Sequence, residues 1–222
     1  YGYYSLQHDY PVFRCQAMYH RANPICTATV VGKPKQEDFF LGDYLQQLLA
    51  PLFPLAMPTV EDLWSYGETG YHSLAAAVVK QRYKRETMVS AFRILGEGQL
   101  SLTKFLLLTD KKQDLKNFPR VLEYILERAD FRSDLYVFSN LAMDTLDYTG
   151  PKVNHGSKGV LLGVGEAIRD LPYEFQGQLP SGITAAQPFC RGCLVLQGES
   201  FATDPALASR VAQTDSFSSW PM

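Results

Sequence analysis

The sequence predicts an α/β protein in which helices flank a sheet. From residue 60 onward, short apolar runs typical of buried strands alternate with segments that repeat apolar residues at helical spacing, which favours a largely parallel sheet. Before residue 35, alternating and β-branched segments indicate a separate group of strands. With 222 residues, 46% of them hydrophobic, the chain is long enough to bury a sizeable core.

The first 56 residues predict two strands and one helix. Residues 12–19 alternate and residues 25–31 are β-branched, so we expect two strands joined around residues 20–24. Phe40, Tyr44, Leu48 and Leu52 then recur every four residues, which predicts an amphipathic helix that stops near Pro54.

The middle of the chain predicts strands alternating with helices. Residues 73–79, 105–108 and 135–138 are apolar runs suited to buried strands. Between the first two lies a helix that ends at Gly96. Between the second and third lies a helix capped by Asn117, with Pro119 in its first turn, where a missing N–H costs least. The inner faces of these helices are Met88, Ala91, Phe92 and Leu95, and Phe118, Val121, Leu122, Ile125 and Leu126.

After residue 140 the regular pattern weakens. Residues 150–165 carry five glycines and a proline, which predicts a loop-rich segment. The last forty or so residues suggest irregular structure around one short strand at 193–197, and residues 214–222 are expected to form a loosely held tail.

Charge and cysteine content exclude several classes of protein. A net charge of -2, from 21 basic and 23 acidic residues, gives no general attraction for nucleic acids or anionic membranes. The apolar runs are too short or too interrupted by proline to span a bilayer. Four cysteines are too few for a disulfide scaffold of this size, and no secretion signal is evident, so we expect a cytoplasmic protein.

Spacing alone identifies no catalytic set and no metal site. Cys190 and Cys193 form a CxxC motif, but zinc needs a second pair and the other two cysteines are 11 residues apart, which favours two reduced thiols. The glycines at 156–165 match neither the phosphate-loop motif G-x-x-x-x-G-K-[ST] nor the dinucleotide-binding fingerprint, which needs a third glycine. Lys104 precedes an all-apolar strand, where its charge could hold a phosphate, although an exposed flanking lysine is the ordinary interpretation.

Four stretches, in order and at characteristic separations, resemble a known family. They are "GYYSLQHDYPVFRCQAMYHRANPICTATVVGKPKQED", "LSLTKFLLLTD", "LDYTGP" and "HGSKG". Together they are similar to the C-terminal half of UbiD-type decarboxylases, which use prenylated FMN to remove or add carboxylate on aromatic and unsaturated acids. The resemblance covers about residues 1–170. Residues 127–151 are most similar to the branch that decarboxylates a dihydroxynaphthoate in the futalosine route to menaquinone, and the alternative is the polyprenyl-4-hydroxybenzoate decarboxylase of ubiquinone biosynthesis.

The resemblance implies a division of the chain into four parts. Residues 1–35 would be the C-terminal strands of a truncated split-barrel flavin domain, 36–56 a linking helix, 57–175 the α/β C-terminal domain, and 176–222 an irregular extension. The family's Glu–Arg–Glu catalytic set lies before the "GYY" motif, so we expect it upstream of residue 1. The chain starts with Tyr1 rather than methionine. We therefore expect a fragment that is inactive alone.

The resemblance also implies site residues, cofactors and partners. Lys104 matches the family lysine that reaches the flavin phosphate, and residues 143–148 match a segment lining the substrate pocket, which nominates Met143 and Leu146. The full-length enzyme would use prenylated FMN with Mn²⁺ or Mg²⁺ and, as a further candidate, K⁺, with no metal ligand in this chain. The expected partners are a small aromatic carboxylic acid, further copies of the protein and a flavin prenyltransferase that supplies the cofactor, but no nucleic acid.

Three departures and two rival functions remain open. The chain has "GSKGVLL" where many relatives continue "GSKMG", Gln46 stands where the linking helix often has glutamate, and the last fifty residues fall outside the resemblance. One rival is a non-catalytic binding or oligomerisation module. The other is a nucleotide-binding α/β domain, which rests on the glycines alone. Peripheral membrane association is the alternative to a purely cytoplasmic location.

Overall fold

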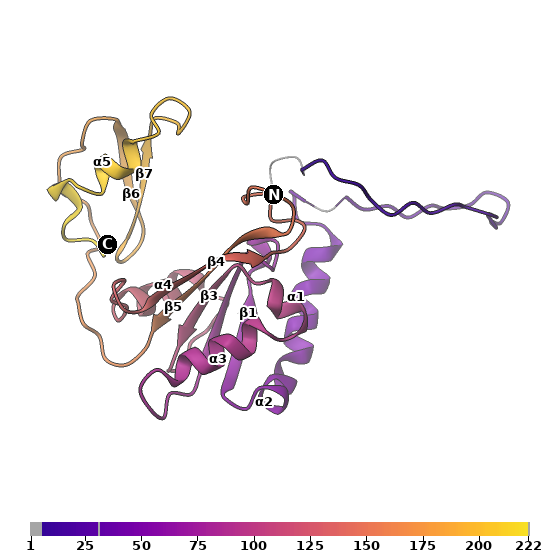
Figure 1. Ribbon diagram of the computed structural model, residues 1–222, viewed down its shortest axis with the longest axis horizontal. Helices are drawn as coiled ribbons and strands as arrows, with labels where there is room; N and C mark the ends of the chain where they lie inside the picture. Colours follow the sequence, from indigo (N-terminus) through magenta and orange to yellow (C-terminus); the bar gives the residue numbers. More distant parts are fainter. Residues whose placement is uncertain (1–5, 31, 222) are drawn as a thin grey trace.

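A five-stranded sheet with helices on both faces forms the centre of the molecule (Figure 1). The structure is a computed structural model that describes residues 6–30 and 32–221. The expectations for Tyr1, Tyr3, Tyr4, Val31 and Met222 therefore fall outside the described residues. The strand order is β1-β2-β3-β5-β4, built from β1 Val60–Ser65, β2 Leu74–Val79, β3 Phe105–Thr109, β4 Leu135–Ala142 and β5 His155–Gly163.

The sheet is mixed, not largely parallel. β3 pairs in parallel with both β2 and β5, whereas the edge strands β1 and β4 run antiparallel to their neighbours. Two connections, from β1 to β2 and from β4 to β5, return directly without a crossover helix, which only antiparallel pairing permits. The predicted α/β class is confirmed.

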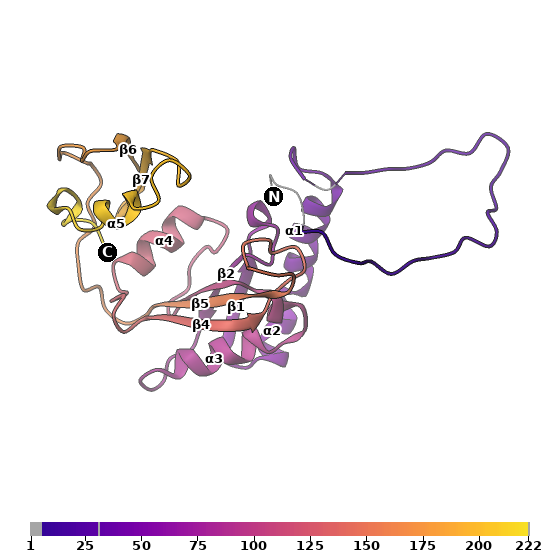
Figure 2. The ribbon, with the colours of Figure 1, turned by 45° about the horizontal axis from the view of Figure 1, so that its top comes forward.

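Helices α3 (Glu86–Leu95) and α4 (Phe118–Leu126) cover opposite faces of the sheet (Figure 2). One buried cluster joins α3 to alternate strand residues such as Leu106 and Leu108, and the other joins α4 to Leu107. Because successive strand residues point to opposite faces, the continuous apolar run of β3 serves both layers. The predicted cap is confirmed, since the Asn117 side chain accepts a hydrogen bond from the Arg120 N–H.

Most of the glycine-rich segment, residues 155–163, forms strand β5 rather than a loop, while residues 150–154 form turns and bends as expected. Its residues 158–163 are buried, and it lies between β3 and β4. Gly159 lies against the Phe105 ring, and a Cβ at Gly163 would be 2.5 Å from the Ile125 Cα of α4. The glycines are therefore positions of close packing within a strand, and the sequence-based prediction was wrong for residues 155–163.

Residues 6–30 form no strand, which corrects the expected pair of strands in this segment. The segment extends away from the sheet as an irregular arm, and most of its side chains are exposed (Figure 1). A strand needs a neighbour for its backbone N–H and C=O groups, and no described strand lies beside the arm.

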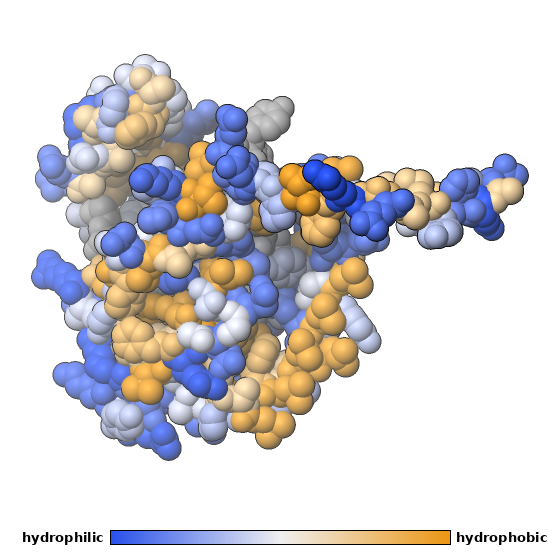
Figure 3. All heavy atoms as spheres, turned by 45° about the vertical axis from the view of Figure 1, so that its right-hand side comes forward, coloured by the Kyte–Doolittle hydropathy of each residue, from blue (hydrophilic) through white to orange (hydrophobic). Residues whose placement is uncertain are grey.

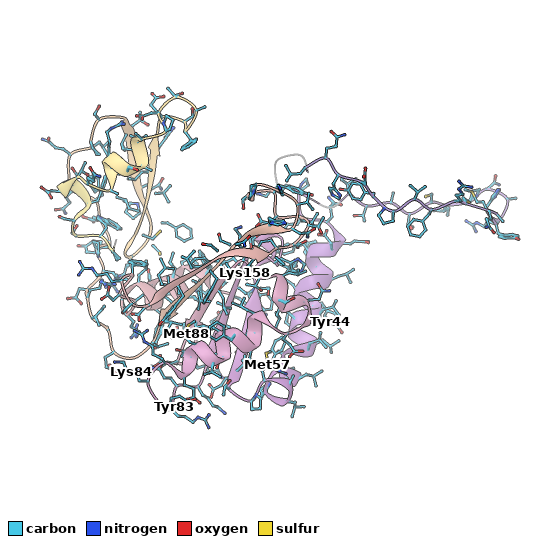
Figure 4. The ribbon with its side chains drawn as sticks, viewed as in Figure 1. Tyr44, Met57, Tyr83, Lys84, Met88 and Lys158 are labelled. Carbon is cyan, nitrogen blue, oxygen red and sulfur yellow. The ribbon has the colours of Figure 1, made fainter. Side chains whose placement is uncertain are left out.

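The expected linking helix is present and extends slightly beyond Pro54. α1 (Glu37–Leu49) continues through a 3₁₀ turn, η1 (Ala50–Leu52), into the short α2 (Phe53–Ala56). Its apolar side faces away from the sheet, however, because Phe40, Tyr44, Leu48 and Leu52 are all more than half exposed. Figure 4 shows Tyr44 on the outer side of α1.

The C-terminal residues are more regular than predicted. A hairpin of β6 (Ile183–Cys190) and β7 (Cys193–Gly198) is followed by α5 (Leu207–Val211) and a 3₁₀ turn, η4 (Asp215–Phe217). Phe217 and Trp220 are buried, so residues 214–221 are packed and do not form a loose tail. Two further 3₁₀ turns are η2 (Gly67–Thr69) and η3 (Gly98–Leu102).

None of the helices in the described ranges is both long enough and apolar enough to cross a membrane.

Candidate functional site

Lys104 immediately precedes the central strand β3, at the end of the sheet where β2 and β3 begin. Its N–H donates to the His72 carbonyl at 2.8 Å, and its own carbonyl accepts from the Gly159 N–H at 2.8 Å. These bonds hold the Lys104 backbone between β2 and β5. The position of the side chain is therefore set by the central strands of the sheet.

The Lys104 ammonium forms an ion pair with Asp147. Nζ lies 2.5 Å from Oδ2 of the carboxylate, whose other oxygen accepts from the Thr149 hydroxyl at 2.6 Å. Burial alone would raise the pKa of Asp147, but the hydrogen bonds from Lys104 and Thr149 hold this pKa below its usual value. Asp147 is therefore ionised at neutral pH and orients the lysine.

A second pair joins the same loop to β2. His72 Nδ1 contacts the Asp144 carboxylate, and Asp144 also accepts from the Leu146 N–H at 3.0 Å. Two acidic residues, three positions apart, thus tie residues 143–149 to the ends of two neighbouring strands. Sequence reasoning missed His72, Asp144 and Asp147, although the "LDYTGP" motif contains Asp147 and the spacing of the two acids was visible.

Lys158, on β5, is the second lysine at this end of the sheet (Figure 4). It is only 7% exposed, and Nζ donates to the carbonyls of Ser101 and Thr103 at 2.8 Å each. Burial, together with repulsion from Lys104, lowers the pKa of Lys158. Its hydrogen bonds fasten η3 to β5, so we assign it a structural role.

The two predicted substrate-pocket residues lie beside Lys104. Met143 is buried and Leu146 is partly exposed, and both line a hollow with Lys104 of only about 10 Å³. That hollow is too small for an aromatic acid, since ligand pockets measure roughly 300–1,000 Å³. The structure brings the three predicted residues together, and their roles stay predictions.

Lys104 also lines a larger hollow of about 450 Å³. Its polar lining offers hydrogen-bond donors, and no acidic side chain of the described residues contributes to it. The Lys104 ammonium, the Asn140 amide, the Ser157 hydroxyl and the His155 imidazole suit the oxygens of a phosphate, so this lining fits the phosphate end of a flavin nucleotide. The lining residues are Lys104, Asn140, Thr149, Gly150, Pro151, His155, Gly156 and Ser157.

The CxxC cysteines lie on either side of the turn of the β6–β7 hairpin. Cys190 and Cys193 face each other across the turn of the β6–β7 hairpin as free thiols. Burial raises the pKa of Cys190 to about 12 and also raises that of Cys193, which disfavours the reactive thiolate. Within the described part of the chain, no three His, Cys, Asp or Glu side chains are grouped to hold a metal ion.

A further hollow, of about 700 Å³, has neither Lys104 nor its neighbours in the lining. It lies among α4, the β6–β7 hairpin and α5, and contains none of the predicted site residues. Most of its lining residues are apolar, among them five leucines and three aromatic residues. Its ionisable lining residues are Cys193, Glu199 and Asp204, of which Asp204 is paired with Arg210. Because the predicted site residues lie elsewhere, Lys104 remains the centre of the candidate site.

Comparison with known families gives two adjacent matches. Residues 39–163 match the family described as the 3-octaprenyl-4-hydroxybenzoate carboxy-lyase C-terminal domain, UbiD_C. Residues 1–34 match the Rift-related domain of the same carboxy-lyase, UbiD. The first match covers more than half of the chain and includes every residue of the candidate site.

Individual relatives are longer proteins. A protein of Chlamydia pneumoniae, named as one of the subunits of a 4-hydroxybenzoate decarboxylase, is 57% identical over 222 residues, which is 100% of this chain but 38% of the relative. The chain thus spans about two fifths of the length of such relatives.

Two solved structures share the fold. The vanillic acid decarboxylase of Sedimentibacter hydroxybenzoicus in its open form matches with a TM-score of 0.55 and 22% identity, over 73% of this chain and 35% of that one. The 3,4-dihydroxybenzoic acid decarboxylase of Enterobacter cloacae matches with a TM-score of 0.50 and 17% identity, over 59% and 29%.

Proposed function

This chain belongs to the UbiD carboxy-lyase family, and we propose that it forms the C-terminal part of an enzyme that decarboxylates an aromatic acid without oxidation, using prenylated FMN. The observation that carries the proposal is the hollow beside Lys104, in which one ammonium and several neutral donors converge. Members of the family are carboxy-lyases, and the proposal assigns that activity to the longer polypeptide that contains this chain.

In this proposal Lys104 binds the flavin phosphate. Its ammonium carries three N–H donors, so it can keep its bond to Asp147 while donating to a phosphate oxygen in the larger hollow. Asp147 acts as a positioning residue, and Ser157 can add a hydroxyl donor. When bound, the prenylated flavin would accept electron density from the substrate ring while carbon dioxide leaves.

The acid–base step is assigned to residues outside this chain. The Glu–Arg–Glu set of the family, and the ligands for Mn²⁺ or Mg²⁺ and for K⁺, are expected upstream of residue 1. The chain alone would therefore lack turnover and would contribute phosphate binding and a wall of the pocket.

We propose a hydroxylated aromatic acid as the substrate. A dihydroxynaphthoate of menaquinone biosynthesis is the first candidate, because residues 127–151 are most similar to that branch. Polyprenyl-4-hydroxybenzoate is the alternative, and the name of the Chlamydia pneumoniae relative adds plain 4-hydroxybenzoate. Met143 and Leu146 would supply apolar contacts to the ring if the loop of residues 143–149 opens.

The proposed partners follow from the same assignment. The enzyme would associate with further copies of itself and would receive its cofactor from a flavin prenyltransferase. One relative is named as a subunit, which supports an assembly of several chains.

The test is carbon dioxide release by the longer polypeptide loaded with prenylated FMN. The three acids are compared at equal concentration, with the 222-residue chain assayed in parallel. We expect release from one hydroxylated acid and none from the chain alone. Enzymatic turnover by the chain alone would refute the division of labour, and no release from any aromatic acid would favour the non-catalytic module.

A further inference from the structure

Cys190 and Cys193 are paired directly across the two-residue turn of the β6–β7 hairpin. They are Cα partners in the ladder, and only Arg191 and Gly192 separate them. Facing residues of an antiparallel pair point to the same side of the sheet, with their Cα atoms about 4.5–5.5 Å apart. Disulfides join residues whose Cα atoms are roughly 4.4–6.8 Å apart, so the hairpin already provides the backbone spacing that this bond requires.

The side chains and the turn fit the same bond. Both cysteines are free thiols, and each thiol is the hydrogen-bond partner of the other. Gly192 has a φ of 77°, a left-handed conformation that glycine adopts without steric cost. A bond between the two sulfurs therefore requires no change in the pairing of the strands.

The same turn fastens the C-terminal lobe, residues 183–221, to the rest of the chain. This lobe stands above the sheet domain in Figure 1 and at the top of the molecule in Figure 3. The Arg191 N–H donates to the Glu123 carboxylate of α4 at 3.0 Å, and the Gly192 N–H donates to the Pro172 carbonyl at 2.8 Å. Both donors belong to the turn that the two cysteines enclose, so a covalent link would hold them in their docked positions.

The surroundings of the two thiols favour a disulfide that is slow to form and hard to reduce. Burial raises the pKa of Cys190 and of Cys193. A disulfide is reduced readily when ionisation stabilises the thiols that reduction releases, and these thiols gain little from ionisation at neutral pH. The low fraction of thiolate also slows the exchange that forms the bond. These properties suit a bond that stabilises structure and disfavour a rapidly cycling redox centre.

We propose that Cys190 and Cys193 are a site of disulfide formation that holds the β6–β7 turn against α4. The oxidant is a disulfide of low molecular weight, such as oxidised glutathione. The thiolate of one cysteine attacks this disulfide, forms a mixed disulfide and releases one glutathione, which takes up the proton that the cysteine lost. The thiolate of the other cysteine then attacks the protein sulfur of the mixed disulfide and releases the second glutathione in the same way. Two protein thiols thus lose two electrons, and one glutathione disulfide becomes two thiols.

A redox titration with peptide mapping tests the site. The longer polypeptide is equilibrated in buffers of increasing ratio of oxidised to reduced glutathione, quenched in acid and alkylated. Mass spectrometry should find the peptide with residues 190–193 unalkylated and lighter by two hydrogen atoms. The matched control combines Cys193→Ser with Leu194→Cys, which keeps two thiols in the hairpin but points one of them to the other face. We expect an equilibrium constant for closure at least tenfold lower in this control.

Hydrogen exchange tests the effect of the bond on docking. The amides of Arg191 and Gly192 should exchange at least tenfold more slowly in the oxidised protein than in the reduced one. Cys190→Ser should show no such difference between the two conditions. Failure of the bond to form across the titration, or equal closure in the displaced-thiol control, would overturn the proposal. Equal exchange of the oxidised and reduced protein would overturn its effect on the turn. None of these measurements depends on flavin binding or decarboxylation.

Discussion

Strand β5 and the arm of residues 6–30 have opposite surroundings. β5 lies between β3 and β4, which satisfy its backbone on both sides, and six of its residues are buried. The arm meets no described strand, and its apolar residues are exposed, such as Val12 at 88%. β5 is rich in glycine and the arm in β-branched and aromatic residues. In this molecule, the presence of neighbours decides which segment becomes a strand.

The largest effect is expected at the most crowded position of β5. A Cβ at Gly163 would meet the Ile125 Cα at 2.5 Å, and this backbone can move only if α4 moves. We expect Gly163→Ala to lower the free energy of unfolding by about 3 kcal/mol, as measured by urea denaturation.

Gly159→Ala is the matched control on the same strand. Its nearest neighbour is the Phe105 ring, a side chain that can rotate, so we expect a loss of about 1 kcal/mol. An unchanged stability of Gly163→Ala would contradict the packing role of the β5 glycines.

Lys158 on β5 should produce a pH-dependent effect. Lys158→Met leaves the carbonyls of Ser101 and Thr103 unpaired, with an expected loss of about 1–2 kcal/mol at pH 7. The pKa of Lys158 is lowered in the folded state, so the folded protein binds fewer protons than the unfolded chain and the wild type gains stability as pH rises toward about 10.

Urea denaturation near pH 7 and near pH 9.5 checks this sign. The difference in unfolding free energy between the wild type and Lys158→Met should be larger at the higher pH. For the exposed Lys111→Met, this difference should not change with pH. A difference that becomes smaller would mean that the lysine is buried as a stabilised cation.

Breaking the Lys104–Asp147 ion pair should lower the free energy of unfolding by a smaller amount, and this loss should disappear at low pH. Asp147→Asn is expected to cost about 1 kcal/mol at pH 7, because the carboxylate is held by Lys104 and Thr149. The pKa of Asp147 is lowered on folding, so its contribution is present above about pH 4 and is lost as the pH falls through the folded-state pKa. In a pH series, the difference in unfolding free energy between the wild type and Asp147→Asn should vanish in acid. Glu166→Gln, which removes one partner of an exposed pair, should unfold with the same free energy as the wild type.

The smallest effect is expected in the arm. Val12→Ala or Phe13→Ala should change the unfolding free energy of the 222-residue chain by less than about 0.5 kcal/mol, since both side chains are exposed. In the longer polypeptide, where the Rift-related domain would supply neighbours, the same changes should cost more. A loss above about 1 kcal/mol in the short chain would show that the arm already packs against something.

Periodicity predicted the parts of the fold whose neighbours lie close in sequence. Helix α4 is the clearest case, because its cap and its inner face could be recognised locally. β5 was missed because its glycines fit ring and helix atoms that only the folded sheet brings near. For α1 the apolar face was identified, but spacing cannot tell whether such a face meets the sheet or another molecule.

The candidate site was also predictable only in part, because its ion pairs join residues that are far apart in sequence. Lys104, Met143 and Leu146 came from a family resemblance, and the structure places them around one hollow. The pairing of Lys104 with Asp147 spans 43 residues, and that of His72 with Asp144 spans 72. Residues so distant in sequence come close only because the order of the strands in the folded sheet places them side by side.

The measurement that tests the central claim most directly compares the affinities of FMN and riboflavin, which lacks the phosphate, for the longer polypeptide. The wild type should bind FMN more tightly. Lys104→Met should weaken FMN binding at least tenfold, about 1.4 kcal/mol, with riboflavin affinity unchanged and Lys111→Met behaving as the wild type. An undiminished preference for FMN in Lys104→Met would contradict the assignment of Lys104 as the phosphate ligand.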